Sequence, residues 1–135
     1  YEGYCSDMTR TIFMGCILEE IKPVYDLTLK NLELSTKEIT DGYTIKTAAN
    51  MVESDFKVNG YNLIHALGHG VGLEVHELPF IRLKNEANFK ENMVIADEPG
   101  IYLPGKYGIR IEDTLLVTKD GSERLTKSER GYVVI

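Results

Sequence analysis

Residues 107–118 read YGIRIEDTLLVT, a stretch that combines the pattern of a β-strand with charged side chains near its middle. Alternate side chains of a strand point to opposite faces, so Arg110, Glu112 and Thr114 share one face. The run Leu115–Val117 that follows is wholly apolar, which is typical of a central strand covered on both sides. The polar face therefore meets either solvent or an interior polar site. The apolar run favours the interior site, with both Arg110 and Glu112 inside it.

Apart from one stretch near the start, the chain predicts helices first and strands afterwards. Apolar side chains recur at helical spacing over residues 22–35 and 44–57. Strand-forming residues bounded by turn signals occupy four stretches, namely 8–14, 92–103, 107–118 and 123–126. Helices and strands in separate blocks indicate an α+β fold with an antiparallel sheet. A length of 135 residues suits one domain.

Composition excludes several classes of protein. The chain is 43% hydrophobic and 27% charged, which is ordinary for a soluble globular domain. Its 21 acidic and 15 basic residues give a net charge of −6, which disfavours nucleic acid as a partner. No apolar run reaches the length of a membrane span, so no membrane partner is expected. Cys5 and Cys16 do not have the spacing of a metal or redox motif, and reduced thiols in the cytoplasm are expected.

All three histidines fall within HALGHGVGLEVHE, residues 65–77. A helical turn would place His65 and His69 on one face, and the glycines between His69 and His76 allow the backbone to bend tightly. A single histidine usually has a structural role. Three histidines in one segment indicate a functional site as strongly as they indicate a structural role. A zinc-protease helix is excluded, because Phe80 stands where that motif needs a second histidine after His76.

Three carboxylates also lie in strand-like surroundings: Asp7, Glu98 and Glu112. Each alone is most simply a surface charge at a strand end. Glu98 and Glu112, however, have a spacing that suits facing positions on paired strands. Carboxylates brought together in this way repel unless cations neutralise them or one is protonated. An imidazole with several carboxylates suits Mn²⁺, Co²⁺, Fe²⁺ or Zn²⁺, and a pair of such ions supports hydrolysis.

Four blocks, SDMTRT, GHGVGLEVHE, DEPGIY and RIEDT, resemble in order and spacing the signatures of the pita-bread metallopeptidases. They look most like the Xaa-Pro branch, which comprises prolidase (Xaa-Pro dipeptidase) and aminopeptidase P. His65 and Arg110 favour that branch over methionine aminopeptidase. The resemblance implies a curved antiparallel sheet covered by helices. It also implies that residues 1–135 are the C-terminal portion of a single catalytic domain.

The resemblance further implies a centre of two divalent metal ions, with Mn²⁺ expected first and Co²⁺, Zn²⁺ or Fe²⁺ as alternatives. Its ligands would be Asp7, His69, Glu98 and Glu112, with Glu112 bridging the two ions.

Other roles also come from the resemblance. His76 would stabilise the oxyanion that forms at the scissile carbonyl, and His65 would contact substrate nearby. Glu98 would in addition accept a proton from the bridging water. Arg110 and Thr9 would hold the ligand carboxylates in place by hydrogen bonds.

One departure from the family pattern concerns a metal ligand. The family has an earlier aspartate that bridges both metals, but only six residues precede Asp7 and none of them is an aspartate. The chain also begins with Tyr1 rather than Met. We therefore expect the missing ligand upstream of Tyr1, together with the upstream half of the fold and an N-terminal domain. The chain by itself is expected to have little or no peptidase activity.

The expected substrate is a proline-containing peptide or dipeptide, and a homodimer is expected for the parent protein because family members are often dimers. The sequence does not choose between dipeptidase and aminopeptidase P. Four residues are candidates for the proline pocket, although aromatic residues near strand ends are more often core: Phe80, Ile101, Tyr102 and Tyr107. The alternatives are a metal-free binding module of the same fold, a methionine aminopeptidase, or an α+β domain whose acidic strands face water.

Overall fold

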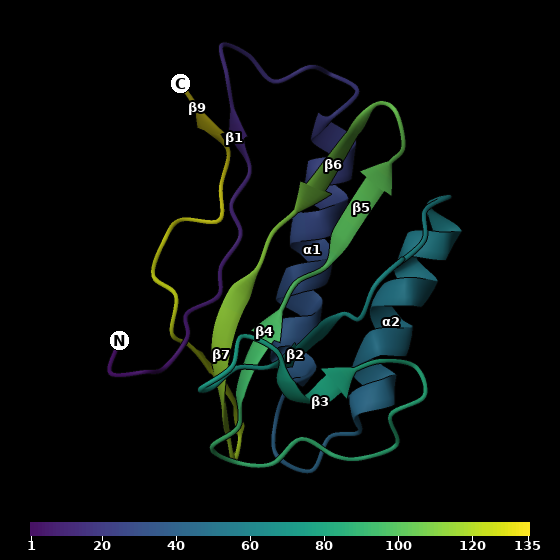
Figure 1. The fold of residues 1–135 in the computed structure, drawn as a ribbon. Coiled ribbons are helices and arrows are strands. Elements are labelled where there is room, and N and C mark those ends of the chain that lie inside the picture. The colour runs from purple at the N-terminus through teal and green to yellow at the C-terminus, as the bar shows by residue number, and fades with distance from the viewer.

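The computed structural model describes residues 1–135 and contains two helices and nine strands (Figure 1). The helices are α1 (Lys22–Glu38) and α2 (Ile45–Val58). The strands are β1 (Ile12–Phe13), β2 (Gly68–Gly70), β3 (Glu77–Ile81), β4 (Val94–Asp97), β5 (Gly100–Leu103), β6 (Tyr107–Arg110), β7 (Asp113–Thr118), β8 (Gly121–Arg124) and β9 (Val133–Val134). The predicted α+β class is confirmed. Neither helix is long and apolar enough to cross a membrane.

The main sheet has five antiparallel strands in the order β3-β2-β4-β7-β8. The hairpin β5–β6 continues β4 and β7 in the same register, since Asp97 pairs with Asp113 and Gly100 pairs with Arg110. The two strands predicted over 92–103 and 107–118 are therefore each interrupted. Pro99 has no N–H for the ladder, and the Glu112 N–H donates to the Thr9 carbonyl instead. Glu98 and Glu112 lie at these two interruptions, side by side.

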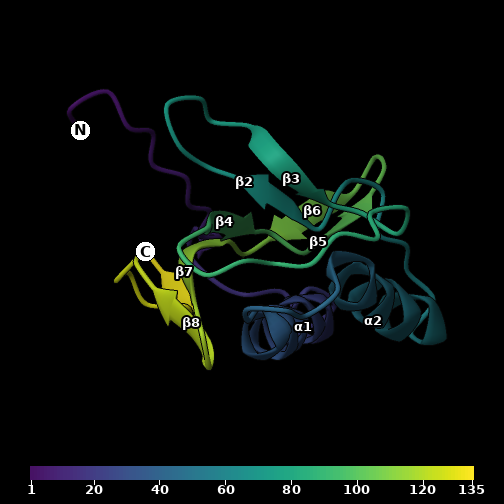
Figure 2. The ribbon, with the colours of Figure 1, turned by 90° about the horizontal axis from the view of Figure 1, so that it is seen from below.

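Both helices cover one face of the sheet, and the opposite face is free of helices (Figure 2). The predicted helices over 22–35 and 44–57 are confirmed, with ends shifted by up to three residues. Pro23 stands in the first turn of α1, where the helix needs no N–H from it. The apolar stripes of the helices pack against the sheet to form the core, whose largest fully buried side chains include Tyr25, Leu32, Phe56, Ile81, Ile95 and Leu115.

The strand predicted over 8–14 is wrong in extent. Only Ile12–Phe13 forms a strand, and it pairs in parallel with β9 rather than with the main sheet. Both edges of β7 are already paired with β4 and β8, so the preceding residues can reach only its end. They do so through an isolated bridge between Thr9 and Glu112. The last predicted strand, 123–126, is shifted to Gly121–Arg124.

Candidate metal centre

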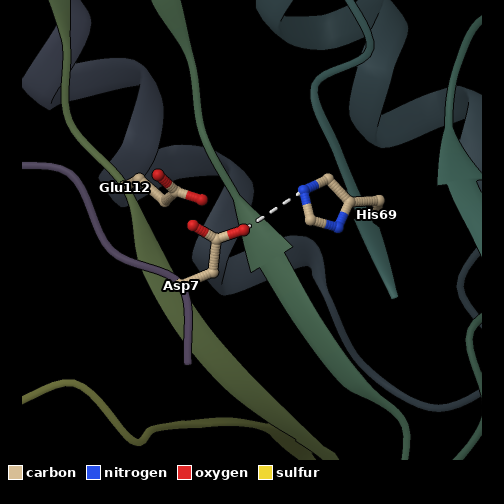
Figure 3. A group of neighbouring side chains, drawn as sticks. All are labelled: Asp7, His69 and Glu112. Atoms are coloured by element: carbon tan, nitrogen blue, oxygen red, sulfur yellow. Dashed lines mark ion pairs between the residues drawn. The ribbon is translucent and has the colours of Figure 1, made fainter. Parts of the chain in front are cut away.

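Three chain segments bring Asp7, His69 and Glu112 together on the helix-free side of the sheet (Figure 3). Asp7 comes from the N-terminal segment, His69 from the middle of β2, and Glu112 from the link between β6 and β7. One ligand atom from each lies within 4.8 Å of the other two. Glu98 stands beside them, with its Oε1 3.6 Å from His69 Nε2. The four predicted ligands are therefore neighbours.

His69 is held so that one ring nitrogen is available as a ligand. Its Nδ1 lies 3.0 Å from the Gly70 carbonyl oxygen. A carbonyl can only accept, so Nδ1 carries the proton and Nε2 keeps its lone pair in the neutral ring. Nε2 lies 3.5 Å from Asp7 Oδ2. Gly68 allows β2 to lie this close to β4, because a Cβ there would be 1.9 Å from the Ala96 carbonyl oxygen.

Glu112 provides the test of whether the site suits a metal. Its side chain is buried, Oε2 accepts a hydrogen bond from Thr9 Oγ1 at 2.5 Å, and Oε1 has no partner. Burial raises the pKa of Glu112 to about 7; the Thr9 hydrogen bond opposes the rise, and the charges of Asp7 and Glu98 add to it. A divalent cation would give the buried oxygen a partner and would neutralise the repulsion between the neighbouring carboxylates. The donor set of carboxylates and one imidazole therefore fits the metal ions implied by the motifs.

The centre opens into a cleft of ≈ 450 Å³ whose lining includes five of the predicted site residues: His65, His69, His76, Glu98 and Arg110. We call it the catalytic cleft. The ring centroids of His76 and His69 are 4.3 Å apart, and His65 packs edge-on against Tyr102 at 5.4 Å. His76 is exposed and forms no ion pair with the carboxylates, so it is free to meet a bound molecule.

Arg110 is not inside the protein, contrary to the sequence-based expectation. Its side chain is 42% exposed at the rim of the catalytic cleft. The aliphatic part of an arginine can cross the rim while the guanidinium stays in water, so no burial of charge is needed. Arg110 Nε donates to Thr9 Oγ1 at 3.1 Å, and Nη1 lies 3.8 Å from Glu98 Oε2. These contacts agree with a role in positioning the ligands.

Two of the four candidates for the proline pocket, Phe80 and Tyr102, line the catalytic cleft. Ile101 is buried in the hydrophobic core, and the Tyr107 hydroxyl donates to the Glu20 carbonyl outside the cleft. The sequence pattern could not separate the two residues that line the cleft from the two that do not, because all four are apolar or aromatic residues near strand ends.

Sequence reasoning missed a buried ionic cluster around Asp113, whose side chain is 0% exposed. Asp113 accepts hydrogen bonds from Arg10 Nη2 at 2.6 Å, Arg130 Nε at 2.5 Å and Thr126 Oγ1 at 2.5 Å. Burial alone would raise the pKa of Asp113, but these hydrogen bonds and the charge of Arg130 outweigh it and lower the pKa. The available signal was a carboxylate on the same strand face as Ile109 and Ile111, where a charge needs partners.

The Asp113 cluster also supports the candidate metal centre. Arg10 Nη1 donates to the backbone carbonyls of Thr9 at 2.8 Å and Glu112 at 2.6 Å. Thr114 Oγ1 donates to the Asp7 carbonyl at 2.6 Å. The backbones that carry two of the ligands are therefore tied together.

Known proteins are similar to this chain over nearly its whole length. The model of metallopeptidase family M24 matches residues 1–119. A Xaa-Pro dipeptidase of Pyrococcus furiosus is 45% identical over 132 residues, which are 96% of this chain and 38% of that protein. An X-Pro aminopeptidase from Thermotoga maritima superposes with a TM-score of 0.96 at 40% identity, covering 100% of this chain and 39% of the other. A methionine aminopeptidase from Thermotoga maritima gives 0.84 at 27% identity, covering 95% and 60%.

The chain spans less than two fifths of the dipeptidase and the X-Pro aminopeptidase, at 38% and 39% of their lengths. Within that span, the motifs, the fold and the neighbouring positions of the four predicted ligand side chains agree with one another. The resemblance to the pita-bread metallopeptidases is confirmed, and the chain belongs to metallopeptidase family M24.

Proposed function

We propose that the protein is a metal-dependent exopeptidase that hydrolyses the Xaa-Pro bond at peptide N-termini or in dipeptides. The observation that carries this proposal is the convergence of Asp7, His69 and Glu112, whose ligand atoms lie within 4.8 Å of one another. Glu98 and His76 border the same centre. We further propose two divalent ions, with Mn²⁺ first and Co²⁺, Zn²⁺ or Fe²⁺ as alternatives.

The ligand set on this chain supports the proposal that more donors come from outside it. The unpartnered Oε1 of Glu112 is suited to a bridging position, which needs a second ion and further ligands. The dipeptidase relative is much longer than this chain. We therefore propose that residues before Tyr1 supply another carboxylate and complete the catalytic domain. The isolated chain is then expected to bind metal weakly and to have little activity.

When bound, the metal ions supply hydroxide at neutral pH and polarise the scissile carbonyl. The remaining chemistry belongs to residues of this chain. Glu98 would accept the proton of the attacking water and pass it to the proline nitrogen as the C–N bond breaks, and its nearness to Arg110 would keep its carboxylate oriented. His76 donates an imidazole N–H to the oxygen on which negative charge develops. Phe80 and Tyr102 offer flat apolar surfaces to the proline ring.

The test uses the full-length protein, meaning this chain together with any residues encoded before or after it. We expect it to cleave Ala-Pro or Ala-Pro-Ala with Mn²⁺ and to lose activity with chelator. Bound metal should also raise the melting temperature, since it binds only the native state. A melting temperature indifferent to Mn²⁺ and chelator, with no cleavage, would identify a metal-free binding module. Preferential cleavage of Met-Ala would identify a methionine aminopeptidase. A cytoplasmic location and a homodimer stay predictions.

A further inference from the structure

A second cavity of ≈ 470 Å³ adjoins the catalytic cleft, and we call it the distal cavity. The two share four lining residues, Ile64, His65, Ala66 and Arg82, so they meet at these residues. The distal cavity lies between α2 and β3, which pack side by side (Figure 1). Its volume is in the range of small-ligand sites. The groove therefore extends beyond the residues that the proposed hydrolysis uses.

His65 stands at the junction with an unused acceptor. Its Nδ1 lies 2.7 Å from the Ala66 carbonyl oxygen and must be the donor, while Nε2 is buried and has no partner. A buried polar atom without a partner is unusual in a folded protein. Because Nε2 has no exposed surface, the ring must rotate slightly toward the junction before an amide N–H of an entering peptide can donate to it. Proline in a peptide has no N–H, so the first such donor after an Xaa-Pro bond belongs to the third residue.

Arg82 supplies a free positive charge at the same junction. Its guanidinium carbon lies 4.7 Å from the centroid of the Phe80 ring, a cation–π arrangement that holds the group over the cleft. Arg82 forms no ion pair and no side-chain hydrogen bond, whereas Arg110 is engaged with Thr9 and Tyr102. The donors of Arg82 are therefore available to a ligand carboxylate.

The other charges of the distal cavity reinforce this preference. Lys84 adds a second positive charge to the lining. Glu53 is the acidic lining residue, but it is paired with Lys57 at 2.5 Å. Ala49, Leu63 and Ile81 provide an apolar surface beside these charges. The cavity thus suits an amino-acid residue that ends in a carboxylate.

We propose that the distal cavity binds the residue that follows the proline, and that Arg82 binds its C-terminal carboxylate. This inference rests on the proposed function and narrows it to tripeptides of the form Xaa-Pro-Yaa. An enzyme that cleaves the first bond of a peptide must place all later residues on the carboxyl side of the metal centre, and the distal cavity continues the groove. Because one extended residue spans about 3.5 Å, the carboxylate of a dipeptide ends one residue short of the position that the third residue reaches.

The experiment compares Ala-Pro, Ala-Pro-Ala and Ala-Pro-Ala-amide as substrates of the metal-loaded full-length protein. In R82Q we expect the KM for Ala-Pro-Ala to rise about fivefold with kcat unchanged, because a contact made equally in ground and transition states is lost. The amide and the dipeptide should be cleaved as by the wild type. Arg82 is exposed, so the substitution leaves the core intact. The control K106Q removes the same charge from the β5–β6 turn and should change none of the three KM values.

Two results would overturn the inference while the proposed function stands. One is that the wild type has the same KM for Ala-Pro-Ala and for Ala-Pro-Ala-amide. The other is an R82Q effect that is as large for Ala-Pro as for Ala-Pro-Ala, or that K106Q reproduces. Failure of the wild type to cleave any of the three peptides would instead refute the proposed function, and this inference with it.

Discussion

Replacing Asp113 by asparagine tests how the buried ionic cluster supports the candidate metal centre. Asparagine keeps the size of the side chain but removes the charge that Arg10 and Arg130 share. Those two arginine side chains are only 10% and 18% exposed, so water cannot replace the lost partner fully. Removing one partner of a buried ion pair costs about 3–5 kcal/mol. That is a large part of the ~5–15 kcal/mol by which a domain is stable.

The substitution should weaken metal binding as well. Arg10 holds the backbone carbonyls of Thr9 and Glu112, and it loses its anchor when Asp113 loses its charge. Mutation of a residue that holds metal ligands in place typically lowers metal affinity by about 10- to 100-fold. We expect Asp113→Asn to fall in this range.

Urea unfolding of the metal-free full-length protein at pH 6 measures the first effect, and calorimetric titration with Mn²⁺ measures the second. Asp97→Asn is a matched control, because Asp97 is also fully buried and pairs directly with Asp113 across β4 and β7. Asp97 has the hydroxyls of Ser35 and Thr36 as partners and forms no ion pair. Burial raises the pKa of Asp97 to about 7, so at pH 6 its neutral form dominates and asparagine changes no charge.

We expect Asp97→Asn not to lower the unfolding free energy at pH 6, because folded Asp97 is already neutral there and the unfolded variant no longer releases a proton. Equal destabilisation by both substitutions would show that burial of a carboxylate, and not its pairing with arginines, decides the cost. An unchanged Mn²⁺ affinity in Asp113→Asn would refute the link from the cluster to the metal centre.

Three further predictions concern the centre and its surroundings. Glu112→Gln should lower metal content and activity together, measured by elemental analysis and Ala-Pro cleavage, because it removes the negative charge of the carboxylate that we propose as a bridge between the ions; normal metal content would contradict that role. His76→Ala should lower kcat by about 10²–10³ while metal content stays normal, because His76 meets the substrate and not the ions; loss of metal would reverse this assignment. Folded Asp97 keeps its proton up to about pH 7, whereas the unfolded chain releases it above its ordinary pKa of 3.8, so the contribution of Asp97 to stability is complete below pH 3.8 and is lost as pH rises from there through 7. Asp97→Asn should remove that part of the pH dependence in urea unfolding between pH 4 and 7, and an unchanged slope would contradict the raised pKa.

Strand alternation predicted the local environment of Glu112 well, and that of Arg110 poorly. Glu112 is buried on the polar face, as expected, because it stands directly before β7, which is central in the sheet. Arg110 shares that face but lies beyond the interruption of the strand, where β5 and β6 form a separate hairpin. Periodicity gives the direction of a side chain and not the place where neighbouring strands stop covering it. The exposure of Arg110 could therefore not be predicted from the sequence pattern.

The extent of the N-terminal strand was unpredictable for a related reason. Residues 8–14 have the composition of a strand, but a strand needs an unpaired neighbour with which to form a ladder. β7 offers none to the residues before Ile12, and β1 instead pairs with β9 at the other end of the chain. Propensity states what a segment can form, whereas tertiary competition for partners decides what it forms.

The sequence by itself determined the family, the two helices and the candidate metal ligands, because these depend on short motifs and local periodicity. Only the tertiary structure decided that Asp7 meets Glu112, that Asp113 collects two arginines, and that Arg82 faces an open cavity. Each of these contacts joins segments distant in sequence, and the chain must close long loops and exclude water to form them. No local pattern of residues records which distant partner will fill that space.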